Sequence, residues 1–245
     1  MKSLFVIGSL LFLLFITTEC HNAAAQQQPD NPDDVPMEHR HMDMGPHMYL
    51  TATRPQKPGD QQQAEEVLKA ARKVMNQYRD YKIALHDGFE IFLPNVPQKM
   101  YHFTNREYGL EAQSTRFNPE HPTSLLYEKE GDGYKLIGVM YTASVLSTEE
   151  EIDKRAPLSI AQWHKHVNIC LPPWDKRSKV QKKDPRFGFS GSITAKDECD
   201  KAGGEFHPVI FGWMVHVYPD GKTPEEIWSV ERQHDDNMQQ GGHGM

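Results

Sequence analysis

The sequence predicts a single α+β domain, a mixed or antiparallel sheet with a long N-terminal helix packed on it, between disordered His- and Met-rich tails. Two observations lead to this fold class. Apolar residues recur every three or four positions along residues 61–81, which is the spacing of an amphipathic helix. Beyond it, short alternating runs are separated by turn residues, as in antiparallel strands. The 245 residues are enough for one good-sized domain, which we place at residues 60–230.

The N-terminus reads as a signal peptide over residues 1–25. Lys2 is followed by an apolar run at residues 4–16 that is too short to span a membrane. Small residues at 23–25 favour cleavage before Gln26, and a lipid anchor on Cys20 is the disfavoured alternative. We therefore expect a secreted or periplasmic protein with no transmembrane segment after the signal is removed.

Residues 26–59 and 231–245 are polar and are predicted to be disordered tails. The first tail is rich in Met and His. Thioether sulfur prefers Cu(I), and imidazole binds copper or zinc, so such a tract could capture an ion without a preformed cage. The alternative is a low-complexity tail that binds nothing. The candidate tail ligands are His39, His41, Met42, Met44, His47 and Met48.

The remaining elements follow in order. The helix at 61–81, with Asp60 as its cap, continues to a stop at Asp87-Gly88. Extended segments are expected at 89–93 and 100–105. Gly131-Asp132-Gly133 predicts a tight hairpin, and Ser147 to Glu150 resembles a capping box. Further predicted strands, taken in sequence order, are 124–129, 134–143, 163–170 and 211–218.

The strand at residues 163–170 carries the most informative pattern. Alternation places His164, His166, Asn168 and Cys170 on one face, opposite a mostly apolar face. An imidazole-bearing face needs an explanation, which is either a hydrogen-bonded His pair or a metal site. His216 repeats the pattern on the last strand.

His102 lies on a third extended segment, between two aromatic residues. If these strands are neighbours, three or four imidazoles project from one face, the pattern of a catalytic zinc or mononuclear copper site. The alternatives are a metal-free polar cleft and ordinary core histidines. The candidate metal ligands are His102, His164, His166 and His216, with Met140 and Met214 as soft ligands and Asn105, Asn168 and Tyr218 as residues that orient the imidazoles.

Cys170 and Cys199 are the two cysteines that remain in the mature domain. In an oxidising compartment we expect them to form a disulfide, which would stabilise the fold by roughly 3–4 kcal/mol. The alternative is that Cys170 is a thiolate ligand beside the histidines.

Several classes of protein are disfavoured by composition and motifs. A net charge of −7 argues against nucleic acid as a partner. The sequence contains no His-Glu-x-x-His, Cys-x-x-Cys or Gly-x-Ser-x-Gly motif, no P-loop and no dinucleotide-binding fingerprint.

Short motifs spread over residues 79–228 carry a resemblance to a family. They include Met100-Tyr101-His102-Phe103, Trp163-His164-Lys165-His166, and His216-Val217-Tyr218. On these, the chain resembles a family of uncharacterised secreted bacterial proteins, a domain of unknown function with a Trp-His-x-His strand and a His-Val-Tyr strand. The resemblance implies a single domain with a His-centred site but no particular activity. Relatives often carry an acidic residue where Met140 stands, so a softer ion is implied here.

Together these patterns predict an extracytoplasmic metal-binding protein with a histidine-cluster site, with copper favoured over zinc. The first alternative is a metal-dependent enzyme at the same site. The second is a metal-free module that binds a small molecule or an envelope partner.

Overall fold

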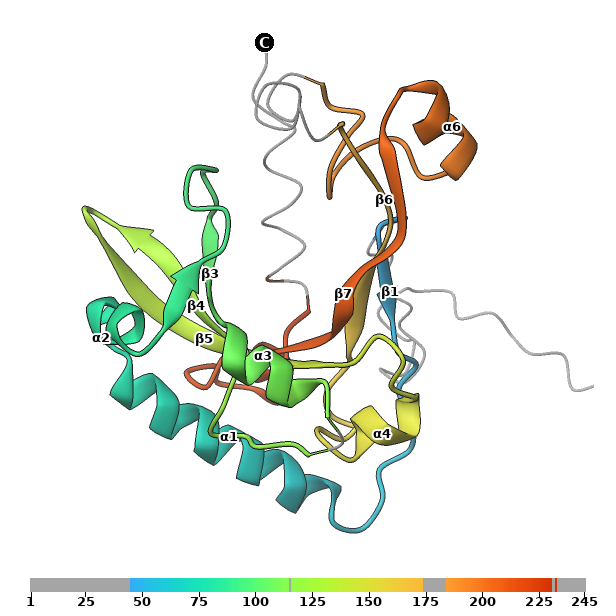
Figure 1. The fold of residues 1–245 in the computed structure, drawn as a ribbon. Coiled ribbons are helices and arrows are strands. Elements are labelled where there is room, and N and C mark those ends of the chain that lie inside the picture. Colours follow the sequence, from blue (N-terminus) through green and yellow to red (C-terminus); the bar gives the residue numbers. More distant parts are fainter. Residues whose placement is uncertain (1–44, 115, 174–183, 231, 233–245) are drawn as a thin grey trace, which may run out of the picture. The chain divides into compact units, whose positions relative to one another are not determined.

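The computed structural model describes residues 45–114, 116–173, 184–230 and 232. They form an α+β fold around one seven-stranded antiparallel sheet with the strand order β1-β6-β7-β5-β4-β3-β2 (Figure 1). The strands are β1 (Met48–Leu50), β2 (Phe89–Ile91), β3 (Met100–Asn105), β4 (Ser124–Glu130), β5 (Gly133–Ala143), β6 (His164–Leu171) and β7 (Glu205–Val217).

Helices lie between these strands along the chain, and one helix follows the last strand. They are α1 (Asp60–Gln77), α2 (Tyr81–His86), α3 (Arg106–Ala112), α4 (Glu149–Asp153), α6 (Lys196–Lys201) and α7 (Pro224–Ile227). In the part of the chain that the structure describes, no helix is both long enough and apolar enough to cross a bilayer.

The helical region expected at 61–81 is divided into two helices. α1 ends at Gln77, and the Asp80 side chain then caps α2 by accepting from the backbone N–H of Lys82. Asp60 does not cap α1, because Gly59 holds the cap position with a φ of 96°. Its carboxylate instead accepts from the Arg54 guanidinium at 2.6 Å, and this ion pair lowers the pKa of Asp60 well below its ordinary value.

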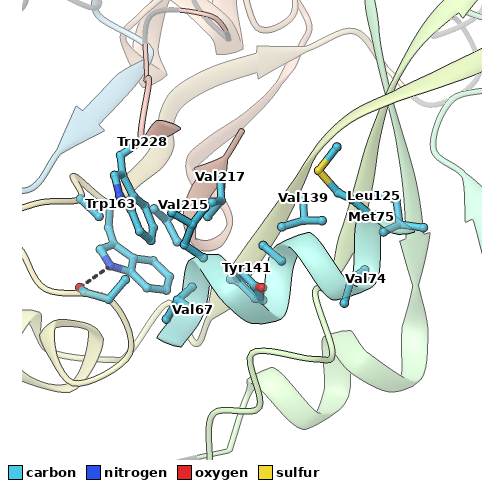
Figure 2. Packing of buried hydrophobic residues seen from close by; sticks show 14 of the residues in the cluster. Val67, Val74, Met75, Leu125, Val139, Tyr141, Trp163, Val215, Val217 and Trp228 are labelled. Carbon is cyan, nitrogen blue, oxygen red and sulfur yellow. Dashed lines mark hydrogen bonds between the residues drawn. The ribbon is translucent and has the colours of Figure 1, made fainter. Parts of the chain in front are cut away.

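One face of the sheet packs against α1 and forms the main apolar core (Figure 2). Val67 and Val74 of α1 lie against residues of the central strands, and Trp163 closes one end by donating from its indole N–H to the Ala156 carbonyl at 3.2 Å. Full burial of a valine contributes about 1.5–3 kcal/mol, so this face is the main source of stability. The central strands contribute Leu125, Val139, Tyr141, Val215 and Val217.

The expectation of disorder for residues 26–59 is wrong for residues 45–59, which are part of the domain. Met48 pairs with His166, so β1 extends the sheet beyond β6. His47 is buried: its Nε2 lies 2.6 Å from the Gly191 carbonyl and its Nδ1 3.3 Å from the Val167 carbonyl. His47 and Met48 therefore lie in the folded domain and not in a disordered tail.

Other predictions for the ends of the chain concern residues outside the described ranges. These are the signal peptide, the lipid-anchor alternative at Cys20, the C-terminal tail, and the candidate tail ligands His39, His41, Met42 and Met44.

The predicted disulfide between Cys170 and Cys199 is confirmed, with the two Cα atoms 5.7 Å apart. Cys170 is therefore not a thiolate ligand. Phe187 and Ile193 pack on the disulfide, which ties α6 to the end of β6. Disulfides are typical of proteins that fold outside the reducing cytoplasm.

Replacing both cysteines with serine should lower the free energy of unfolding by about 3–4 kcal/mol, because the unfolded chain loses a cross-link spanning 29 residues. Urea denaturation of the variant and of the wild type, each with and without reductant, measures this. Reductant should lower the stability of the wild type alone. Equal stabilities in the absence of reductant would contradict the prediction.

Candidate functional site

The strand registers place four histidines on the face opposite the main core. Met140 of β5 pairs with His216 of β7, and Met214 of β7 pairs with His164 of β6. Side chains alternate along a strand, so these residues lie on the other side from Val139, Tyr141 and Val215. The four histidines are His102, His164, His166 and His216.

The imidazole rings form a continuous chain of contacts. Ring centroids are 5.7 Å apart for His102 and His216, 5.2 Å for His216 and His164, and 5.7 Å for His164 and His166. The structure thus brings together the four candidates that the strand pattern selects. We call them the histidine cluster.

A sharp curl of the sheet makes the first of these contacts. His102 is on β3 and His216 on β7, three steps apart in the strand order, or roughly 14 Å in a flat sheet. Gly138 lies between them on β5, where a Cβ atom would meet the Val217 carbonyl oxygen at 2.6 Å and the Tyr218 ring at 2.8 Å. Only a residue without a side chain permits this close approach.

Two histidines of the cluster are buried and have ring nitrogens without a hydrogen-bond partner among the described residues. His164 is 1% exposed and His216 is 3% exposed. Among the described residues, neither ring nitrogen of His164 has a hydrogen-bond partner, and the same is true of Nε2 of His216. A buried polar group without a partner costs about 1–3 kcal/mol, so the fold carries a penalty here that its own contacts do not offset.

Tyr218 orients the ring of His216. Its hydroxyl oxygen lies 3.3 Å from His216 Nδ1 and 3.6 Å from the sulfur of Met100. A thioether can only accept, so when the hydroxyl donates to Met100 it accepts from Nδ1–H of His216. The neutral ring then has its lone pair on Nε2, the nitrogen without a partner. This is the arrangement by which an outer residue prepares a histidine for a metal ion.

The other two residues predicted to orient the imidazoles do not do so. Asn105 is the N-cap of α3, where its side-chain oxygen accepts from the N–H groups of Glu107 and Tyr108. Asn168 adopts a left-handed backbone with a φ of 56°, and its amide donates to the Pro46 carbonyl. Both predictions failed because alternation alone does not reveal a helix cap or a break in a strand.

Methionine sulfur accompanies the histidines. Met140 and Met214 are buried on the same face, in a small cluster with Leu126 and Tyr218. Met100 belongs to this cluster as well. It is a candidate that the sequence did not single out, although its position two residues before His102 puts the two on one side of β3.

Burial keeps the imidazoles neutral. It lowers the pKa of His102 and of His166 to about 4, and it lowers the pKa of His164 and His216 well below the ordinary value. Repulsion from neighbouring imidazoles adds to the effect at His164, His166 and His216. Neutral imidazole is the form that binds metal ions.

A cavity of about 470 Å³ opens beside the cluster. His102 and His166 line it, together with Met100, Met140 and Met214. Its outer wall carries Phe92, Phe189 and Phe211. His164 and His216 do not line it. Part of the cluster therefore faces a space large enough for a small molecule.

As the side chains stand, no group of three or more His, Cys, Asp or Glu residues in the described ranges is arranged to hold one ion. Comparisons of the chain with protein-family profiles, curated proteins and solved structures found no match.

The low pKa values predict how the stability of the metal-free protein depends on pH. Between pH 6.5 and about pH 4 the unfolded chain binds protons at positions that stay neutral in the fold, so stability falls as the pH falls. For His166 alone the loss is about 3 kcal/mol. Urea denaturation of His166→Gln at several pH values should therefore show a shallower decline than that of the wild type.

The matched control is His86→Gln, because His86 is an exposed residue of α2 with an 88% exposed side chain. It removes an exposed imidazole in place of a buried one. If both variants decline with equal slope, burial of His166 is not the cause.

Proposed function

We propose that this protein is an extracytoplasmic copper-binding protein whose ion is held by the histidine cluster. The observation that carries the proposal is the pair of buried histidines, His164 and His216, with unpartnered nitrogens. Ordinary core histidines are hydrogen-bonded, because an unmet buried nitrogen costs free energy. A metal ion would satisfy the lone pairs and offset that cost.

The ring spacing supports a shared ion. An ion about 2.0–2.1 Å from a ring nitrogen is roughly 3.2 Å from the ring centroid, so two imidazoles at a tetrahedral angle have centroids about 5.2 Å apart. The three pairs of successive rings in the cluster have centroid separations of 5.2 Å and 5.7 Å. Because no three side chains of the described residues converge as they stand, binding would need the rings to reorient, and His102 and His166 border the cavity.

The chemistry of the surroundings favours copper over zinc. The ligands would be neutral imidazoles and thioethers, which carry no charge to offset a buried divalent ion. Cu(I) carries a single charge and prefers soft thioether sulfur, which Met100, Met140 and Met214 supply on the same face. Zinc sites more often include thiolate or carboxylate.

The test is His164→Leu, measured in a chain whose tail residues His39, His41, Met42 and Met44 are changed to serine. Anaerobic titration with Cu(I) against a chromogenic chelator should show one tight ion for the parent chain and at least tenfold weaker binding for the variant. The metal-free variant should be more stable than its parent by about 1–2 kcal/mol, because an unmet polar group is replaced by an apolar one.

His121→Leu is the control, because His121 is half-exposed and pairs with Glu111 away from the cluster. It should bind copper like the parent chain. A destabilised His164→Leu protein that still binds copper would show that His164 is an ordinary core residue. If the natural chain binds copper but the parent chain with the four tail substitutions does not, the ion is bound outside the domain.

A metal-dependent enzyme at the same site is the second candidate, and the cavity is the observation that favours it. His102 and His166 line a space open to small molecules, and catalytic metal sites keep one position open. Adding azide to the Cu(II)-loaded protein should then change its electron paramagnetic resonance spectrum. An unchanged spectrum would indicate a closed site without catalysis.

A further inference from the structure

We propose that the cavity beside the histidine cluster binds a small, neutral aromatic molecule between its wall of phenylalanines and its floor of histidines and methionines. The proposal goes beyond copper binding and does not require the ion, because the groups that would hold the molecule are protein side chains.

Three phenylalanines that line the cavity, Phe92, Phe189 and Phe211, contact one another in a row that ends at His166. Phe189 stacks on Phe211, with ring centroids 6.1 Å apart and planes 11° apart. Phe92 meets Phe211 edge-on at 5.8 Å, and Phe189 meets the His166 ring edge-on at 5.1 Å. These rings come from three separate segments and present both faces and edges, the two surfaces with which aromatic rings prefer to pack.

The present positions of Phe211 and Leu93 contribute little to the stability of the fold. Phe211 has a φ of 68° and is 47% exposed, and Leu93 has a φ of 52° and is 40% exposed. Both line the cavity. A left-handed backbone is unfavourable for a bulky residue, and a half-exposed ring recovers only part of its burial energy. Strain of this kind clusters at sites that bind ligands.

The strain at Phe211 arises in a break in the strand pairing. His164 pairs with Met214 and His166 pairs with Ile210, so β7 carries extra residues opposite β6 at this point. Glycine would fit such a bulge without strain. The phenylalanine is the less favourable choice for the backbone, and its ring is the part that reaches the cavity.

The floor selects against charged molecules. Beside the imidazoles of His102 and His166, the hydroxyls of Thr104 and Ser124 line the cavity and hydrogen-bond to each other at 2.8 Å. Among the described residues, the charged side chains that line the cavity are Lys99, which is exposed, and Asp184, whose carboxylate is held by Arg186 at 2.7 Å. The floor thus offers polar groups without net charge, suited to one hydroxyl or carbonyl group.

The size of the cavity sets the size of the molecule. About 470 Å³ lies within the range of small-molecule sites, roughly 300–1,000 Å³. A compound of one or two rings with a single polar group fits these limits.

The experiment uses the full chain after removal of metal by a chelator, with 2-naphthol as the probe in isothermal titration calorimetry. We expect one molecule bound per chain. Two probes serve as controls: 2-naphthalenesulfonate carries a negative charge on the same rings, and decahydro-2-naphthol lacks aromaticity. Both should bind at least tenfold more weakly. Equal binding of all three, or no binding of 2-naphthol, would overturn the proposal.

The variant is Phe211→Gly, which removes the ring and relieves the strained backbone. It should bind 2-naphthol roughly threefold to tenfold more weakly than the wild type, while its thermal stability is unchanged or higher. Ile83→Ala is the control, because Ile83 is 44% exposed on α2 and does not line the cavity. Equal affinities of the two variants would place the probe elsewhere. The 2-naphthol titration is repeated with the copper-loaded chain. It shows whether the cavity and the copper site bind independently, so that failure of one proposal can be told from failure of the other.

Discussion

The alternation of side chains along paired strands is the constraint on which the rest of the structure depends. Burial of Val139, Tyr141 and Val215 against α1 fixes which face of the central strands is the core. Their neighbours Met140 and His216 must then point to the other face. A slip of one residue in pairing would exchange the two sets and place imidazoles in the apolar core. The energy of the core thus determines where the histidines gather.

The opposite face is built at a cost to stability, and the cost is local. His164 is fully buried, and its ring nitrogens have no hydrogen-bond partner among the described residues. Gly138 has no side chain, which lets the sheet curl and bring His102 close to His216. Apolar residues at these positions would pack better but could bind no ion. Functional sites commonly retain such unfavourable residues, because activity and stability make different demands on the same positions.

The sequence was informative where a local pattern has one physical meaning. Alternation placed His164, His166 and His216 on shared faces, and the two cysteines of the predicted domain left one disulfide to form. It failed where distant segments meet. The curl that joins His102 to His216, the incorporation of β1 into the sheet, and the cap made by Asn105 all depend on contacts that no periodicity encodes.

The segment that contains Phe189 lies beside the disulfide and contacts both the histidine cluster and the cavity. The carbonyl of Cys170 accepts from the N–H of Gly188 at 2.8 Å, and the imidazole of His47 is hydrogen-bonded to the carbonyl of Gly191. Phe189 lies between these two anchors, where its ring meets both His166 and Phe211. These two hydrogen bonds hold the backbone on either side of Phe189, and Phe187 in the same segment packs on the disulfide. Phe189 contacts both the histidine cluster and the cavity. A molecule in the cavity that fixes the Phe189 ring would therefore also change the position of the His166 ring. An ion bound by His166 would in turn change the affinity for that molecule by the same factor.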